Sequence, residues 1–104
     1  MFIKDMLHEE LQNSLQIKID YEKASSALPQ GALVCKKIGG RPYYYLAHRE
    51  GRKVVFDYLG AISDEEIQMY KDAKESRARY RQRISAVNKQ IRFLQKVIRE
   101  KQPV

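Results

Sequence analysis

Apolar residues recur in three different patterns along the chain, and each pattern predicts a different element. Between residues 2 and 27, apolar side chains return every four positions, which is typical of an amphipathic helix. Pro29 and Gly31 follow directly and are residues that end helices, so we expect this helix to end at residue 27. The predicted apolar stripe slants around the helix; it consists of Ile3, Leu7, Leu11, Leu15 and Ile19, with Met6 beside it and with Tyr21 and Ala24 extending it.

Residues 31–60 predict a three-stranded antiparallel meander. Three runs rich in β-branched and aromatic residues are separated by glycine-containing pairs, which is typical of strands joined by tight turns. Gly39-Gly40 suits the positive φ angles of a hairpin turn, and Glu50-Gly51 is taken as the second turn. The predicted strands are 32–38, 41–49 and 52–59.

This register determines which side chains share a face of the sheet. Two-residue turns place Tyr45 opposite Phe56. They also pair Tyr43 with Tyr58, and such cross-strand aromatic pairs stabilise a sheet by about 0.2–1 kcal/mol each. Both faces are largely apolar at their centres, so we interpret Tyr45 and Phe56 as core residues. Cys35, in an apolar run, is expected to be a small buried side chain.

The third predicted element is a long helix over residues 63–101. Ser63 and Glu66 form a capping box, in which the two residues satisfy free backbone amides of the first turn. Neither proline nor glycine occurs again before Pro103. At 1.5 Å per residue, the helix would be roughly 57 Å long.

An apolar seam follows the second half of this helix, with alternating spacings of three and four residues. That is the heptad pattern of helices that pack on one another. The first helix, at roughly 39 Å by the same rise, is too short to cover the whole long helix. Either the sheet covers the first half, or a second copy of the chain covers the rest. We therefore predict a homodimer through the seam residues Tyr80, Ile84, Val87, Ile91, Leu94 and Ile98.

The expected fold class is α+β. One domain over residues 1–104 would consist of the N-terminal helix, the meander and the long helix with its heptad seam.

Basic residues are concentrated in the meander and in the second half of the chain. The net charge of +7 divides into −2 for residues 1–30, +4 for 31–60, −3 for 61–70 and +8 for 71–101. The run SRARYRQR has arginine at alternate positions and few acidic partners one helical turn away. Uncompensated charge of this kind favours a phosphate backbone or an acidic protein surface, the alternative being a solvated helix face.

Two groups of residues are candidates for binding nucleic acid or a nucleoprotein complex. On the long helix, Arg77 and Arg81 are assigned to one side. Arg79, Arg83 and Arg92 are assigned to another. On the meander, aromatic rings beside cations have the chemistry to stack on bases. The full set is Arg77, Arg79, Arg81, Arg83, Lys89 and Arg92 on the helix, with Lys36, Lys37, Arg41, Tyr43 and Tyr44 on the meander.

No sequence pattern indicates an enzyme, a metal site or a cofactor. His8 and His48 belong to no nucleophile–base–carboxylate arrangement, and there is no glycine-rich phosphate loop. A single cysteine excludes an internal disulfide, no apolar stretch reaches the roughly 18 residues of a membrane span, and early carboxylates disfavour a signal peptide. We expect a non-enzymatic cytoplasmic protein without a small-molecule substrate, cofactor, metal or membrane association.

A set of short motifs extends from Leu28 to about Glu66. It comprises a Leu-Pro-x-Gly start, a glycine hairpin, the Tyr-rich second strand and Tyr-x-Gly before a charged helix. In these features the chain resembles short uncharacterised bacterial proteins and, more loosely, the arm-type DNA-binding domain of tyrosine integrases. For integrases the resemblance implies a three-stranded sheet laid in the DNA major groove. In this chain both sheet faces are apolar, a helix precedes the sheet, and the last helix is longer than that domain needs.

Three functions follow from these observations. The leading one is a small non-enzymatic basic protein of a phage or mobile element that binds nucleic acid or a nucleic-acid-containing complex. The alternative is a protein-binding inhibitor of a host defence system, of the anti-CRISPR type, docking on a nucleoprotein or an acidic protein surface. A third is a structural coiled-coil adaptor.

Overall fold

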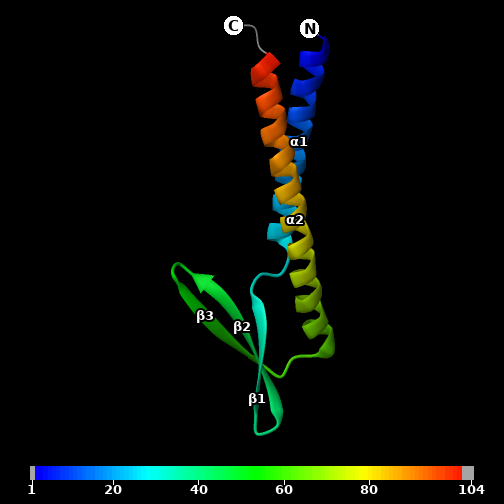
Figure 1. Cartoon of the computed structure of the whole chain (residues 1–104). Coiled ribbons are helices and arrows are strands. Elements are labelled where there is room, and N and C mark those ends of the chain that lie inside the picture. The colour runs from blue at the N-terminus through cyan, green and yellow to red at the C-terminus, as the bar shows by residue number, and fades with distance from the viewer. Residues whose placement is uncertain (1, 102–104) are drawn as a thin grey trace. The chain divides into compact units, whose positions relative to one another are not determined.

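The computed structural model describes residues 2–101, which form an α+β protein (Figure 1). Residues 1 and 102–104, which the predicted single domain includes, lie outside the described residues. The predicted order of elements is confirmed, with small differences at the strand ends. The elements are α1 (Phe2–Ala27), β1 (Ala32–Ile38), β2 (Arg41–Glu50), β3 (Lys53–Gly60) and α2 (Asp64–Lys101).

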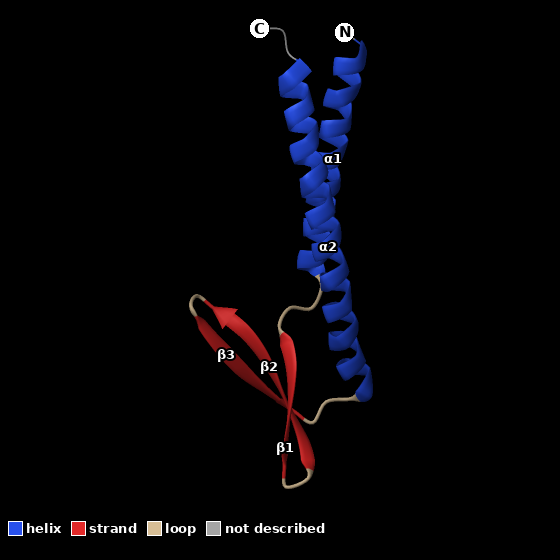
Figure 2. Cartoon of the chain, viewed as in Figure 1, coloured by secondary structure: helices blue, strands red, loops and turns tan. Residues whose placement is uncertain are grey.

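The chain divides into two compact units. In one, a helical hairpin, α1 up to Ser25 runs antiparallel beside α2 from Ala78 onward (Figure 1). The other unit, Ser26–Arg77, contains the three strands in the order β1-β2-β3 and the first turns of α2 (Figure 2). The long helix α2 therefore contributes to both units.

The heptad seam of α2 is buried against α1 within one chain. Ile91, Leu94 and Ile98 are only 7%, 5% and 6% exposed. On α1, Ser14 is fully buried, and its hydroxyl accepts a 3.1 Å hydrogen bond from Gln90 Nε2. The hairpin uses only the part of α2 from Ala78, for which the length of α1 is sufficient. Because the seam has a partner inside the chain, the reason for predicting a homodimer through it does not hold.

The stripe that α1 buries differs from the predicted one. A strict four-residue spacing turns by about 40° at each step, so it leaves the seam after a few turns. Spacings of three and four residues stay on one side. Accordingly Ile3, Met6 and Ile19 are exposed. The side chains on the covered side of α1 include Leu7, Leu11, Ser14, Lys18 and Tyr21.

The turn between β2 and β3 lies one residue later than predicted. Glu50 is opposite Lys53, so the turn residues are Gly51 and Arg52. Gly51 has a φ of +63°, which suits the first position of a tight hairpin turn, where a positive φ is needed. The predicted turn would have put Glu50 in that position. Glycine thus fixes the register of the second hairpin.

The pairing of β2 with β3 is therefore shifted by two residues. Tyr45 is opposite Tyr58, and Ala47 is opposite Phe56, so the two predicted aromatic pairs across these strands are wrong. A shift of two residues keeps every side chain on its predicted face, because strand side chains alternate with a period of two. The β1–β2 register is as predicted, with Val34 opposite Tyr45.

At the start of α2, the Ser63 half of the predicted capping box is formed. The Glu66 amide donates a 3.1 Å hydrogen bond to Ser63 Oγ, and the Ser63 hydroxyl donates to the Glu66 carboxylate at 3.4 Å. The first turn also carries Asp64 and Glu65, whose charges suit the positive end of the helix dipole.

We expect Ser63→Ala to lower the free energy of unfolding by about 0.5–2 kcal/mol, because the Glu66 amide loses its acceptor. Urea denaturation measures the change. Ser85→Ala, at an exposed position within α2, is the matched control and should be neutral or slightly stabilising, since alanine favours helix. Identical unfolding midpoints for wild type and Ser63→Ala would contradict the capping role.

Ile91→Ala should destabilise the hairpin by about 2–5 kcal/mol, the range for truncating a buried isoleucine. The unfolding midpoint of this variant should not depend on protein concentration, because the seam is closed within one chain. Phe93→Ala, two residues away but 64% exposed, serves as the control and should have little effect. Sedimentation that showed Ile91→Ala dissociating a dimer without unfolding it would instead make the seam intermolecular.

Candidate nucleic-acid interface

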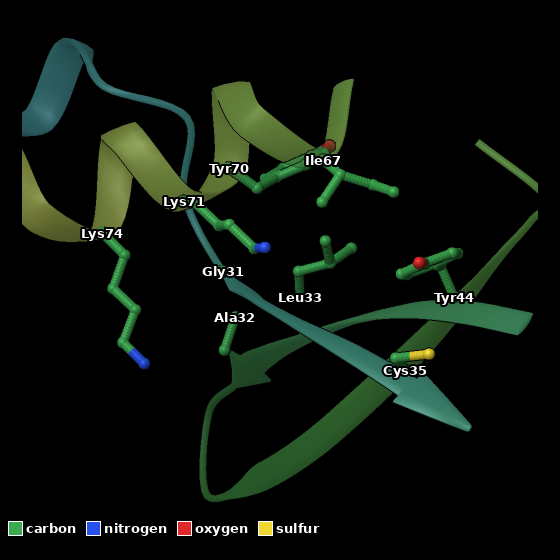
Figure 3. A pocket seen from close by; sticks show the side chains of 9 residues that line it. All are labelled: Gly31, Ala32, Leu33, Cys35, Tyr44, Ile67, Tyr70, Lys71 and Lys74. Atoms are coloured by element: carbon green, nitrogen blue, oxygen red, sulfur yellow. The ribbon is translucent and has the colours of Figure 1, made fainter. Parts of the chain in front are cut away.

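One face of the sheet packs against the first turns of α2. Leu33 of β1 points toward Ile67 and Tyr70 of α2, and the side chains around them enclose an open pocket of about 320 Å³ (Figure 3). Tyr44 and Cys35 line its far end. Burial, reinforced by the neighbouring Cys35 thiol, raises the pKa of Tyr44. The structure therefore places Tyr44 on the covered face, and Cys35, expected to be buried, is exposed at the open pocket.

The opposite face of the sheet presents aromatic rings and cations, and we call it the aromatic face. Phe56 and Tyr58 are 53% and 60% exposed. The interpretation of Phe56 as a core residue was therefore wrong. The helical segment in this unit packs on the other face, so the aromatic face has no helix of its own unit to cover it. Strand alternation gives this face the cationic and aromatic residues Lys36, Arg41, Tyr43, Tyr45, Arg49, Phe56 and Tyr58, together with the aliphatic residues Ala32, Val34, Ile38, Ala47 and Val54.

The rings of the aromatic face form a connected cluster. The Tyr58 ring centroid lies 5.3 Å from that of Tyr45 and 6.4 Å from that of Tyr43. The Lys36 ammonium lies 5.1 Å from the Tyr45 centroid and 5.6 Å from the Phe56 centroid. A cation over an aromatic face is attracted by the ring quadrupole, so Lys36 is held among the rings. The aromatic face thus presents positive charge and aromatic ring surface side by side.

The two carboxylates of the meander lie on the covered face. Asp57 accepts a 2.7 Å hydrogen bond from His48 Nε2, and Glu50 shares the strand alternation of His48. Lys37 also alternates onto that side, away from the aromatic face. The described strands therefore contribute three cations to the aromatic face, Lys36, Arg41 and Arg49, and no carboxylate.

Arg77 has a structural role within the sheet unit. Its Nη1 donates to the Pro29 carbonyl, and its Nη2 donates to the Gly31 carbonyl at 3.1 Å. Gly31 has a φ of +96°, and a side chain there would meet Leu46 at 3.0 Å. Arg77 therefore fixes the segment before β1, and its donors are directed at these carbonyls rather than at a phosphate.

Arg83 is exposed, but its guanidinium lies over two rings of the helical hairpin. Its guanidinium carbon lies 5.9 Å from the ring centroids of both Tyr21 and Tyr80. Gln90, seven residues later on the same flank of α2, bonds Ser14 of α1. Arg83 and Gln90 therefore mark the flank of α2 that contacts Tyr21 and Ser14 of α1.

A row of exposed cations lies on the opposite flank of α2. Lys89, Lys96 and Arg99 are three, four and seven residues from Arg92, and Arg81 is eleven residues away, which places all of them on one side of the helix. Grouping Arg92 with Arg83 was wrong, since nine residues are two and a half turns. We call this set the basic flank, and its members are Arg81, Lys89, Arg92, Lys96 and Arg99.

The basic flank is not neutralised by neighbouring side chains. All five cations are exposed, and within residues 2–101 none forms an ion pair with a carboxylate. Lys96 and Arg99 were absent from the predicted site, although their spacings of four and seven from Arg92 are visible in the sequence. Arg79, in contrast, has an interaction partner.

No cluster of three His, Cys, Asp or Glu side chains suited to a metal ion is found in the described part of the chain. Neither described helix is long and apolar enough to cross a membrane.

The chain belongs to the family described as a domain of unknown function, DUF6788, whose pattern matches residues 7–69. This range includes the aromatic face and ends before the basic flank. Comparison with curated proteins gave no match, and comparison with solved structures gave none either.

We expect Arg77→Met to lower the free energy of unfolding by about 1.5–3 kcal/mol, because the Pro29 and Gly31 carbonyls lose a charged donor. Chemical denaturation measures the loss. Arg81→Met, an exposed arginine one turn further along, is the control and should change stability little. Equal stability of Arg77→Met and wild type would show that these hydrogen bonds do not hold the segment.

Proposed function

We propose that the protein is a non-enzymatic nucleic-acid-binding protein whose basic flank contacts the phosphate backbone. The observation that carries this proposal is a row of five exposed cations without carboxylate partners. Like charges on one flank repel each other, and a polyanion relieves that repulsion by supplying counter-charge.

The geometry of the row suits a regular polyanion. From Arg81 to Arg99, the helix rises by roughly 27 Å at 1.5 Å per residue. That distance corresponds to about eight steps of 3.4 Å along one nucleic-acid strand. A phosphate backbone offers evenly spaced charge over such a length whatever its base sequence, whereas an acidic protein would need a matching row of carboxylates. Contacts of this kind position a protein without selecting a sequence.

The cations of the aromatic face support the same function. They lie in the other compact unit, on a sheet face that also presents positive charge and to which the strands contribute no carboxylate. We further propose that the protein acts in the cytoplasm, where nucleic acid is accessible, and that it belongs to a phage or mobile element, as the loose resemblance to the arm-type domain of tyrosine integrases implies.

Charge reversal of the basic flank tests the proposal. Arg92→Glu combined with Arg99→Glu should weaken binding to labelled nucleic acids of different sequence alike. If both residues contact phosphates, the slope of log affinity against log salt should become shallower by about 1.4 on single strands and about 1.8 on duplex DNA. Fluorescence anisotropy at several salt concentrations measures both effects.

A variant with the same net charge is the control. Lys23→Glu combined with Lys53→Glu changes two exposed lysines that belong to neither surface. We expect it to reduce affinity much less than the Arg92/Arg99 pair. Equal effects of the two double variants would mean that net charge alone acts. If wild type binds no nucleic acid at low salt, the cations are left to an acidic protein surface, as in an inhibitor of the anti-CRISPR type.

A further inference from the structure

We infer that the aromatic face is a stacking platform for unpaired bases, so that the preferred ligand is single-stranded nucleic acid. This inference rests on the proposed function and names the class of nucleic acid that the protein would select. It is carried by the sheet unit and depends on none of the cations of the basic flank.

The exposed rings provide the surface that a base needs. Phe56 and Tyr58 are alternate residues of β3 and are more than half exposed, although both take part in contacts of the face. Alternate residues of an antiparallel strand are about 6.8 Å apart, which is twice the 3.4 Å separation of stacked bases. The exposed part of each side chain is the surface offered to a base. Cross-strand packing explains why the rings touch each other, but it does not explain why they remain so exposed.

Only an unpaired base has a free π face to offer these rings. In a duplex, both faces of an internal base are covered by its neighbours, and the phosphates lie outermost. A sheet that presents ring faces would gain little from such a ligand beyond its charge. Single strands expose base faces and phosphates together, which is the combination that aromatic platforms with flanking cations bind.

The cations of the face are placed to hold the backbone of the strand. Lys36 lies between the Tyr45 and Phe56 rings, and Arg41 and Arg49 lie at opposite ends of β2 on the same side. Because no carboxylate shares this face, a strand crossing the rings meets only attractive charge. Charge complementarity thus favours an anionic ligand over an apolar one, and the exposed rings add the surface on which bases stack.

The test compares wild type with ring variants on three labelled probes at one salt concentration. The probes are poly-dT, polyU and the poly-dA·poly-dT duplex, measured by fluorescence anisotropy. We expect the single strands to bind more tightly than the duplex. Phe56→Leu combined with Tyr58→Leu should weaken single-strand binding by about tenfold or more, with duplex binding nearly unchanged.

Two further variants separate stacking from general effects. Phe93→Leu removes an equally exposed ring from α2 and should leave all three affinities unchanged. Phe56→Trp retains a larger ring and should preserve single-strand binding. This result would separate the loss of a ring from a loss of folding in the leucine variant. Circular dichroism of each variant verifies the fold.

The outcomes distinguish this inference from the proposed function. If the duplex binds as tightly as the single strands, or if the leucine variant keeps its single-strand affinity, the stacking platform is overturned while nucleic-acid binding stands. If no probe binds at low salt, both are overturned. Comparison of the affinities for polyU and poly-dT shows whether the protein binds RNA, DNA or both.

Discussion

Burial of the heptad seam of α2 against α1 is the interaction on which the rest of the structure depends. A helix of this length with an uncovered apolar stripe would expose a patch unusual for a monomer. The hairpin covers that stripe from Ala78 onward, with Ile91, Leu94 and Ile98 almost fully buried. Once the seam is buried, cations are the most numerous kind of side chain left on the surface of this part of α2. The basic flank is therefore exposed because α1 covers the apolar seam of α2 and not its cationic side.

A similar constraint acts in the sheet unit. A three-stranded meander has two faces, and this unit contains one helical segment, the first turns of α2. That segment covers the face with Leu33 and Tyr44, so the opposite face presents its rings to the surroundings. The rings of the aromatic cluster contact one another and Lys36, although Phe56 and Tyr58 stay more than half exposed.

The arginines of α2 show that neighbouring residues of one type take different roles. Arg77 donates to backbone carbonyls, Arg83 packs over two tyrosine rings, and Arg81 is exposed on the basic flank. The difference arises from angular position on the helix and from what lies beside each position. Charge density alone would assign all of them to one site.

The sequence by itself determined the elements, their order and the fold class, because these depend on local signals. The capping box at Ser63, the glycine pair at residues 39–40 and Pro29 act within a few residues of where they stand. The alternation of strands also fixed which residues share a face. The position of the second turn was missed by one residue, although Gly51 carries the signal for it.

What only the tertiary structure decided is which surface is covered and which is free. Sequence patterns showed an apolar seam and two apolar sheet faces, but not that α1 would cover the seam or that Phe56 would be exposed. Nor could they separate Arg77, whose partners lie 46 and 48 residues earlier in the chain, from Arg81. Burial and long-range hydrogen bonds depend on segments far apart in sequence being brought together. The sequence pattern of one helix or strand shows the chemistry of that element, but not which other segment packs against it.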